Sequence, residues 1–308
     1  MKVLGICCGR KNGNTEILMK EAFRVIEKTC GAQCDFIRLQ EARILSCTGC
    51  ESCVVNHMKG NMDFRCVHKP DSDHLYYIEQ LMREADAIIV SAPSYNLLPP
   101  GIMLSFLNRL HGTGDYSKVV QQNNKIGATF TLGGSDRTNF TLTIANVVTK
   151  ELVGSYNAIV DQCNFNHLPA AGAVILEEDI IARIQTLGRH VADALLAQAR
   201  GEAPSYRGDE ALCPDCRSSL LEKHADGWYC PHCMNQATLE MVDGEVQVTF
   251  APETRATNRW THHGVEVHHA GIGAAHAKAA AGKTVIAEKR REYAAYKDAI
   301  KLPEITDK

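Results

Sequence analysis

Eight of the thirteen cysteines fall into two groups in which neighbouring cysteines are separated by two residues. The first group contains Cys47, Cys50, Cys53 and, further along, Cys66, and the second contains Cys213, Cys216, Cys230 and Cys233. A chain of this length builds its own core, and its first residues do not read as an export signal. Metal or cluster ligation is therefore favoured over disulfide bonds.

The first cysteine group is predicted to bind a [4Fe-4S] cluster in a loop of about residues 45–70. Four thiolates, three of them on one short stretch, suit the tight geometry of such a cluster. Two alternatives remain open, in which the cysteines are structural or redox-active thiols without a cluster, or they bind zinc. His57 and His68 lie nearby as substitute ligands, although a solvated loop histidine is the commoner case.

The second cysteine group consists of two Cys-x-x-Cys pairs separated by thirteen residues. This spacing is typical of a zinc ribbon, in which the metal substitutes for a core too small to fold alone. A rubredoxin-like iron site is the rival interpretation. However, Arg217 and Met234 stand where glycine usually follows each pair, and Trp228 and Tyr229 supply few aromatic rings. Structural zinc is the prediction.

A polar loop follows the first predicted strand and leads into the first predicted helix; it comprises Gly9, Arg10, Lys11, Asn12, Gly13, Asn14 and Thr15. Free backbone N–H groups and the helix dipole make such a junction an anion site. The loop matches neither the dinucleotide nor the nucleotide triphosphatase pattern, so FMN is preferred over NAD or ATP. The alternative is a polar turn that Asn12 or Asn14 caps.

Two further segments are expected at the same edge of the sheet. Residues 91–101 follow the third predicted strand, and Tyr95 with the prolines in this run offers a stiff wall for a planar ring. Residues 131–135 follow the fourth strand, where Gly133 and Gly134 let the backbone approach a ligand closely. Open α/β sheets bind their ligands at this edge, so the three loops together predict one site.

These loops belong to an α/β pattern of five strands that alternate with helices. The expected strands are Lys2–Cys7, Cys34–Leu39, Ala87–Ser91, Ile126–Leu132 and Tyr156–Asp161. Helical periodicity predicts helices over Thr15–Lys28, Gly101–Leu110 and Glu178–Ala199. The fold class is therefore a doubly wound, five-stranded parallel sheet of the flavodoxin-like type.

Three domains are expected along the 308 residues. Residues 1–203 form the α/β domain, 204–250 a small zinc-ribbon-like β unit, and 251–308 a partly helical tail that packs on the main domain or on another subunit. The tail holds adjacent histidines, for which a surface or interface role is favoured over metal binding; they are His262, His263, His268 and His269.

Composition excludes some functions. The net charge of -3 lacks the basic excess of a nucleic-acid-binding protein. Apolar runs stay far below the roughly 20 residues that span a bilayer, so no membrane partner is expected. A cytoplasmic location is predicted.

The loop and edge segments resemble the NADPH-dependent FMN reductase branch of the flavodoxin-like superfamily over about residues 1–200. The resemblance implies that the residues of the Gly9–Thr15 loop hold the flavin phosphate. It also implies that the isoalloxazine is bordered by Pro93, Ser94, Tyr95, Asn96, Gly133 and Gly134. Cys8 departs from the Ser or Pro that the family commonly carries at the start of the loop.

The first cysteine group resembles that of the iron-sulfur flavoproteins, although the gap before Cys66 is longer here. This resemblance implies a cluster that relays single electrons to and from FMN, fed by ferredoxin or NAD(P)H, with a small-molecule or protein acceptor. It also implies a homodimer or homotetramer. The alternatives are an NAD(P)H-dependent FMN or quinone reductase without a cluster, and a zinc-ribbon partner-binding module on a flavodoxin-like scaffold. No side chain stands out as a general acid or base.

Overall fold

A computed structural model describes residues 1–59, 66–110, 125–135, 140–154 and 159–300. Close contacts divide the chain into two units, residues 1–262 and residues 263–308, which are treated separately below. Both β-sheets and both cysteine groups belong to the first unit. The domain boundaries expected after residues 203 and 250 stay predictions.

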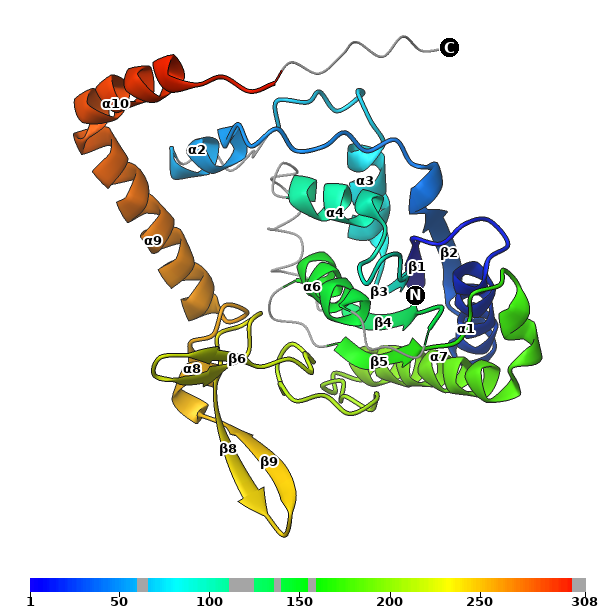
Figure 1. Cartoon of the computed structure of the whole chain (residues 1–308). Coiled ribbons are helices and arrows are strands. Elements are labelled where there is room, and N and C mark those ends of the chain that lie inside the picture. Colours follow the sequence, from blue (N-terminus) through cyan, green and yellow to red (C-terminus); the bar gives the residue numbers. More distant parts are fainter. Residues whose placement is uncertain (60–65, 111–124, 136–139, 155–158, 301–308) are drawn as a thin grey trace. The chain divides into compact units, whose positions relative to one another are not determined.

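The first sheet has five parallel strands in the order β2-β1-β3-β4-β5, which confirms the predicted fold class (Figure 1). The strands are β1 (Lys2–Cys7), β2 (Gln33–Arg38), β3 (Ala87–Pro93), β4 (Ile126–Leu132) and β5 (Ile159–Phe165). The fifth strand runs beyond its predicted end at Asp161, and the predicted positions 156–158 lie outside the described residues. Strands β1, β3 and β4 are almost wholly buried, as expected for a sheet covered on both faces.

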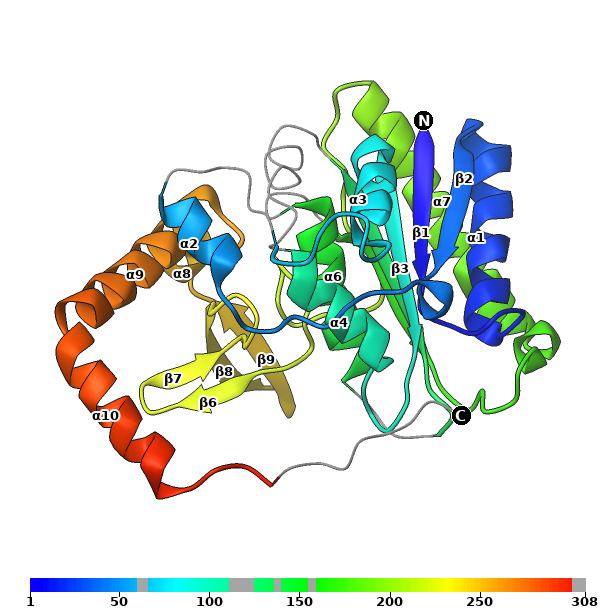
Figure 2. The same ribbon diagram turned by 90° about the horizontal axis from the view of Figure 1, so that it is seen from above.

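Helices cover both faces of this sheet (Figure 2). One face carries α1 (Asn14–Cys30) and α7 (Glu178–Ala199), and the other carries α3 (Leu75–Glu84), α4 (Gly101–Arg109) and α6 (Thr141–Val153). Each face has its own apolar core. The predicted helices that became α1, α4 and α7 are confirmed, and this double winding places the ends of β1, β3, β4 and β5 at one edge of the sheet.

The second sheet is antiparallel, with strands β6 (Glu222–His224), β7 (Gly227–Tyr229), β8 (Gln236–Val242) and β9 (Glu245–Phe250). The short helix α8 (Pro252–Ala256) follows. The buried interior of this small antiparallel unit consists of the second cysteine group and Trp260, with Phe250 at its margin. So few apolar side chains give this small unit little core of its own.

The segment before the second sheet extends the edge of the first. Arg207 and Asp209 donate backbone hydrogen bonds to the carbonyls of Val160 and Gln162 at 2.9 and 3.1 Å. Gly208 lies so close to β5 that a Cβ there would be 2.5 Å from the Gln162 nitrogen. The connecting segment is therefore seated on the β5 edge.

The second unit contains most of α9 (His262–Ala281) and α10 (Lys283–Tyr296). The partly helical tail expected from the sequence is present as these two helices. The helices in the described part of the chain are too short or too polar to span a membrane.

Candidate active site and metal centre

The polar loop between β1 and α1 forms an open cradle of backbone N–H groups. Gly13 is the N-cap of α1 and makes no side-chain capping bond, so the amides of the first helical turn keep their hydrogens free for an anion. The loop closes by a bond from the Gly13 N–H to the Arg10 carbonyl at 3.0 Å, and Asn12 adopts a left-handed φ of 56°. Neither Asn12 nor Asn14 caps α1 with its side chain, so the cap that the alternative of a polar turn expected is absent.

Glu16 braces this loop from behind, a role that the sequence did not reveal. Its side chain is fully buried and accepts hydrogen bonds from Arg38 Nε at 2.6 Å and from the Asn12 N–H at 3.2 Å. These bonds and the Lys20 ammonium outweigh the cost of burial, and the Arg38 hydrogen bond contributes most to lowering the pKa of Glu16 to about 2. An acidic residue in the first turn of a helix was the only signal.

Stability at low pH is expected to depend on this carboxylate. Because the folded-state pKa of Glu16 lies below that of an unfolded glutamate, its contribution of roughly 2 to 3 kcal/mol is complete above about pH 5 and is lost as the pH falls towards 2. Glu16→Gln should therefore flatten the fall in unfolding free energy between pH 5 and pH 3, measured by urea denaturation. Glu240→Gln, at an exposed position of β8, should keep the wild-type slope. An unchanged slope in Glu16→Gln would contradict this role.

Three predicted loops line one cavity of about 220 Å³ at the carboxyl edge of the sheet. The predicted residues that line it are Gly9, Arg10, Gly13, Asn14, Thr15, Pro93, Ser94, Tyr95, Gly133 and Gly134. Lys11, Asn12 and Asn96 belong to the same loops but do not line the cavity. The Ser94 N–H donates to the Leu132 carbonyl at 2.6 Å, which joins the second loop to the third.

A fourth loop, after β5, completes the cavity and was missed by sequence reasoning. Leu168, Pro169 and Ala171 line it, together with Leu132. The Asn14 side chain holds this loop by donating to the carbonyls of Leu168 and Ala170 at 3.2 and 2.8 Å. The loop follows a fifth parallel strand, and that position was the signal that might have identified it.

The first cysteine group lies in the segment that contains α2 (Ser52–Met58). Cys47 and Cys50 are exposed, and Cys53 and Cys66 are half-buried. Hydrogen bonds from Ser52 lower the pKa of the Cys50 thiol to about 7. Across the described residues, no three of these four sulfurs come within 4.8 Å of one another.

The ends of this segment are fixed by a buried ion pair. Arg109, at the end of α4, donates from Nη1 to Asp73 Oδ2 and to the Leu45 carbonyl, both at 2.8 Å. Asp73 also accepts hydrogen bonds from the N–H groups of Leu45 and Leu75. Burial opposes the charge, but these bonds hold the pKa of Asp73 below its usual value. The segment from Leu45 to Asp73 is therefore an insertion with a closed base.

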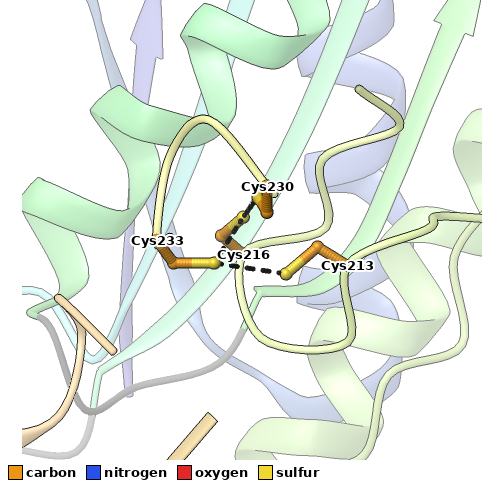
Figure 3. A group of neighbouring side chains, drawn as sticks. All are labelled: Cys213, Cys216, Cys230 and Cys233. Carbon is orange, nitrogen blue, oxygen red and sulfur yellow. Dashed lines mark hydrogen bonds between the residues drawn. The ribbon is translucent and has the colours of Figure 1, made fainter. Parts of the chain in front are cut away.

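The four sulfurs of the second cysteine group meet in a buried cluster, as Figure 3 shows. The Cys213–Cys233 and Cys216–Cys230 sulfurs are 3.4 Å apart, and the Cys233–Cys216 sulfurs are 3.8 Å apart. Four sulfurs at about 2.3 Å around one tetrahedral ion are separated by about 3.8 Å. The arrangement therefore fits a single four-coordinate ion.

Both cysteine pairs adopt the same local fold. The residue after each pair has a left-handed backbone, with a φ of 61° at Arg217 and 60° at Met234. Its N–H donates a hydrogen bond to the backbone carbonyl of the first cysteine of the pair. This conformation costs a residue with a Cβ about 1 kcal/mol or more. Two side chains of α6 meet this region: Asn146 donates to the Arg217 carbonyl, and Lys150 lies 5.6 Å from the Trp260 ring centroid. The second cysteine group is thus tied to α6, which covers the parallel sheet.

Residues 1–152 match the NADPH-dependent FMN reductase family. The chain is 28% identical over 247 residues to the flavone synthase cfoJ of Aspergillus candidus, covering 72% of each. It is 27% identical over 173 residues to an iron-sulfur flavoprotein of Methanocaldococcus jannaschii, covering 56% of this chain and 82% of the relative. It is 32% identical over 111 residues to an iron-sulfur flavoprotein of Archaeoglobus fulgidus, of which it covers 46%.

Among solved structures, a flavone reductase superposes with a TM-score of 0.79 at 21% identity, and the superposition covers 99% of this chain and all of that one. The shared fold therefore extends beyond the parallel sheet to the segment that carries the second cysteine group in this chain. The chain is an FMN-dependent oxidoreductase, and its segment 1–152 matches the NADPH-dependent FMN reductase family.

Proposed function

We propose that this oxidoreductase holds FMN in the cavity at the sheet edge and passes electrons from NAD(P)H or ferredoxin to a small-molecule or protein acceptor. The flavin phosphate would sit on the loop Gly9–Thr15, and the ring would lie between Pro93–Asn96 and Gly133–Gly134. FMN supplies hydride and single-electron chemistry when bound. The observation that carries the proposal is that four loops converge on one cavity beside an uncapped helix N-terminus.

The loop fits a phosphate because glycines at two positions leave its backbone N–H groups accessible. A Cβ on Gly9 would lie 2.7 Å from the Thr15 Cβ, and one on Gly13 would lie 2.9 Å from the Arg10 Cγ. The loop can therefore close tightly only with glycine at both positions. The side chains of Asn14 and Glu16 are engaged in bonds within the protein, which leaves the N–H groups to bind the ligand.

A Gly9→Ala substitution is expected to raise the FMN dissociation constant at least about tenfold, because the added methyl group displaces Thr15 and spreads the cradle. Quenching of FMN fluorescence on titration with apoprotein measures this constant. Gly101→Ala is the matched control at the same sheet edge, since a Cβ there meets nothing within 4 Å. Equal affinities in the two variants would place the phosphate elsewhere.

A [4Fe-4S] cluster bound by Cys47, Cys50, Cys53 and Cys66 is the finer part of the proposal. Similarity to proteins named iron-sulfur flavoproteins supports it, and so does the closed base of the segment that carries the cysteines. Anaerobically purified protein should then contain about four irons and four acid-labile sulfides per chain. Protein that contains FMN but no iron would favour the alternative of an NAD(P)H-dependent reductase without a cluster.

Zinc is proposed for the second cysteine group, because a closed four-thiolate site is typical of structural zinc. A homodimer or homotetramer is proposed as well, with the tail at an interface. Two relatives that align along most of the chain are named for flavones, so flavone is the first acceptor to test.

A further inference from the structure

Exposed apolar side chains gather on the loop after β3, which contributes Tyr95 to the sheet-edge cavity, and on the residue just before α6. Tyr95, Leu97 and Leu98 lie on the loop after β3 and are 51, 48 and 41% exposed, and Phe140, just before α6, is 50% exposed. A single exposed apolar side chain on a protein surface needs no explanation. Several of them joined together on one surface mark a binding site.

Backbone hydrogen bonds join these residues into one surface. Tyr95 and Leu98 pair through reciprocal bonds, with the Tyr95 N–H 2.8 Å from the Leu98 carbonyl. The Phe140 N–H donates to the Leu97 carbonyl at 3.0 Å. Because Tyr95 also lines the cavity, the surface is continuous with the proposed flavin site.

The tip of this loop is strained. Asn96 and Leu97 both have left-handed backbones, with φ values of 51° and 71°. Asparagine tolerates this conformation, whereas leucine adopts it rarely. Leucine at position 97 therefore costs backbone energy. Its exposed side chain offsets this cost only if it contacts a ligand or another molecule.

We propose that Tyr95, Leu97 and Phe140 form an acceptor wall that selects planar, uncharged aromatic acceptors over hydrophilic ones. This proposal rests on the proposed function, since it requires FMN in the adjoining cavity. An aromatic acceptor gains from the burial of its faces against the rings of Tyr95 and Phe140. A charged acceptor would lose its hydration there without compensation, because the wall residues carry no charge.

The test measures binding of flavone to the FMN-loaded protein by the change in flavin absorbance, with ferricyanide reduction by NADH or NADPH as a second readout. Leu97→Asn suits the left-handed backbone but removes the apolar side chain, and Phe140→Ala shortens the wall from the other element. Each should weaken flavone binding at least about tenfold, while ferricyanide turnover falls much less. Met241→Asn, at a 68% exposed apolar position of β8, is the matched control and should bind flavone like the wild type.

Several results would overturn the proposal. They are the absence of flavone binding by the wild-type holoprotein, equal binding by all variants, and loss of FMN from Leu97→Asn, which would make the wall part of the flavin site. A drop in molecular mass of Leu97→Asn by light scattering would instead make the wall a contact between copies of the chain. Failure of the wild-type chain to bind FMN at all would refute the proposed function itself, and is recognised by flavin content before flavone is added.

Discussion

Cys216→Ser is expected to abolish metal binding at the second cysteine group and to lower the unfolding temperature of the chain by about 10 °C or more. Three pairs of sulfurs in this group lie 3.4 to 3.8 Å apart, close enough for all four cysteines to share one ion. Loss of one of the four ligands opens the site. Few apolar contacts would then hold the second sheet, whose core is the cysteine group and Trp260. The loss should spread to the main domain, because Asn146 and Lys150 of α6 contact the same region.

Metal content is measured by mass spectrometry of the purified chain, and unfolding by circular dichroism during heating. Cys34→Ser, at a half-buried cysteine outside both groups, should keep one ion per chain and the wild-type unfolding temperature. Retention of the ion by Cys216→Ser, or an unchanged unfolding temperature after its loss, would contradict a structural metal. Zinc and iron are distinguished in the same measurement.

Arg109→Ala is expected to cost about 3 to 5 kcal/mol of unfolding free energy, because it leaves a buried carboxylate without a counter-charge. Arg109 and Asp73 are both essentially inaccessible to solvent, with 1 and 0% of their side-chain surfaces exposed. The same change frees the Leu45 carbonyl and opens the base of the segment that carries the first cysteine group. Cleavage by a protease between Leu45 and Asp73 should therefore become faster as well.

Urea denaturation gives the free energy, and electrophoresis of timed digests locates the cleavage. The matched control is Arg200→Ala, whose ion pair with Glu202 is exposed and should therefore change the unfolding free energy much less. If the two variants lose the same small free energy, Arg109 does not support the insertion.

The strands and several helices were predictable because their signals are local. Lys2–Cys7 and Ile126–Leu132 are short apolar runs between polar loops, and both have the predicted bounds. Helices α3 and α6 were not predicted. In α6, β-branched residues weaken the local preference for helix, and packing overrides it. Asn146 and Thr149 are buried there only because Gln162 and Thr129 supply hydrogen-bond partners from the sheet.

The sequence by itself determined the order of α/β elements, the loop that offers backbone amides to an anion, and the two sets of cysteines. Each of these depends on neighbours within a few residues, where covalent geometry limits the choices. Tertiary structure alone decided that the loop after β5 completes the cavity through Asn14, that Glu16 meets Arg38, and that Arg109 closes the cysteine-bearing insertion. These pairs are separated by tens to more than a hundred residues, and burial makes each bond strong only after the chain has folded around it.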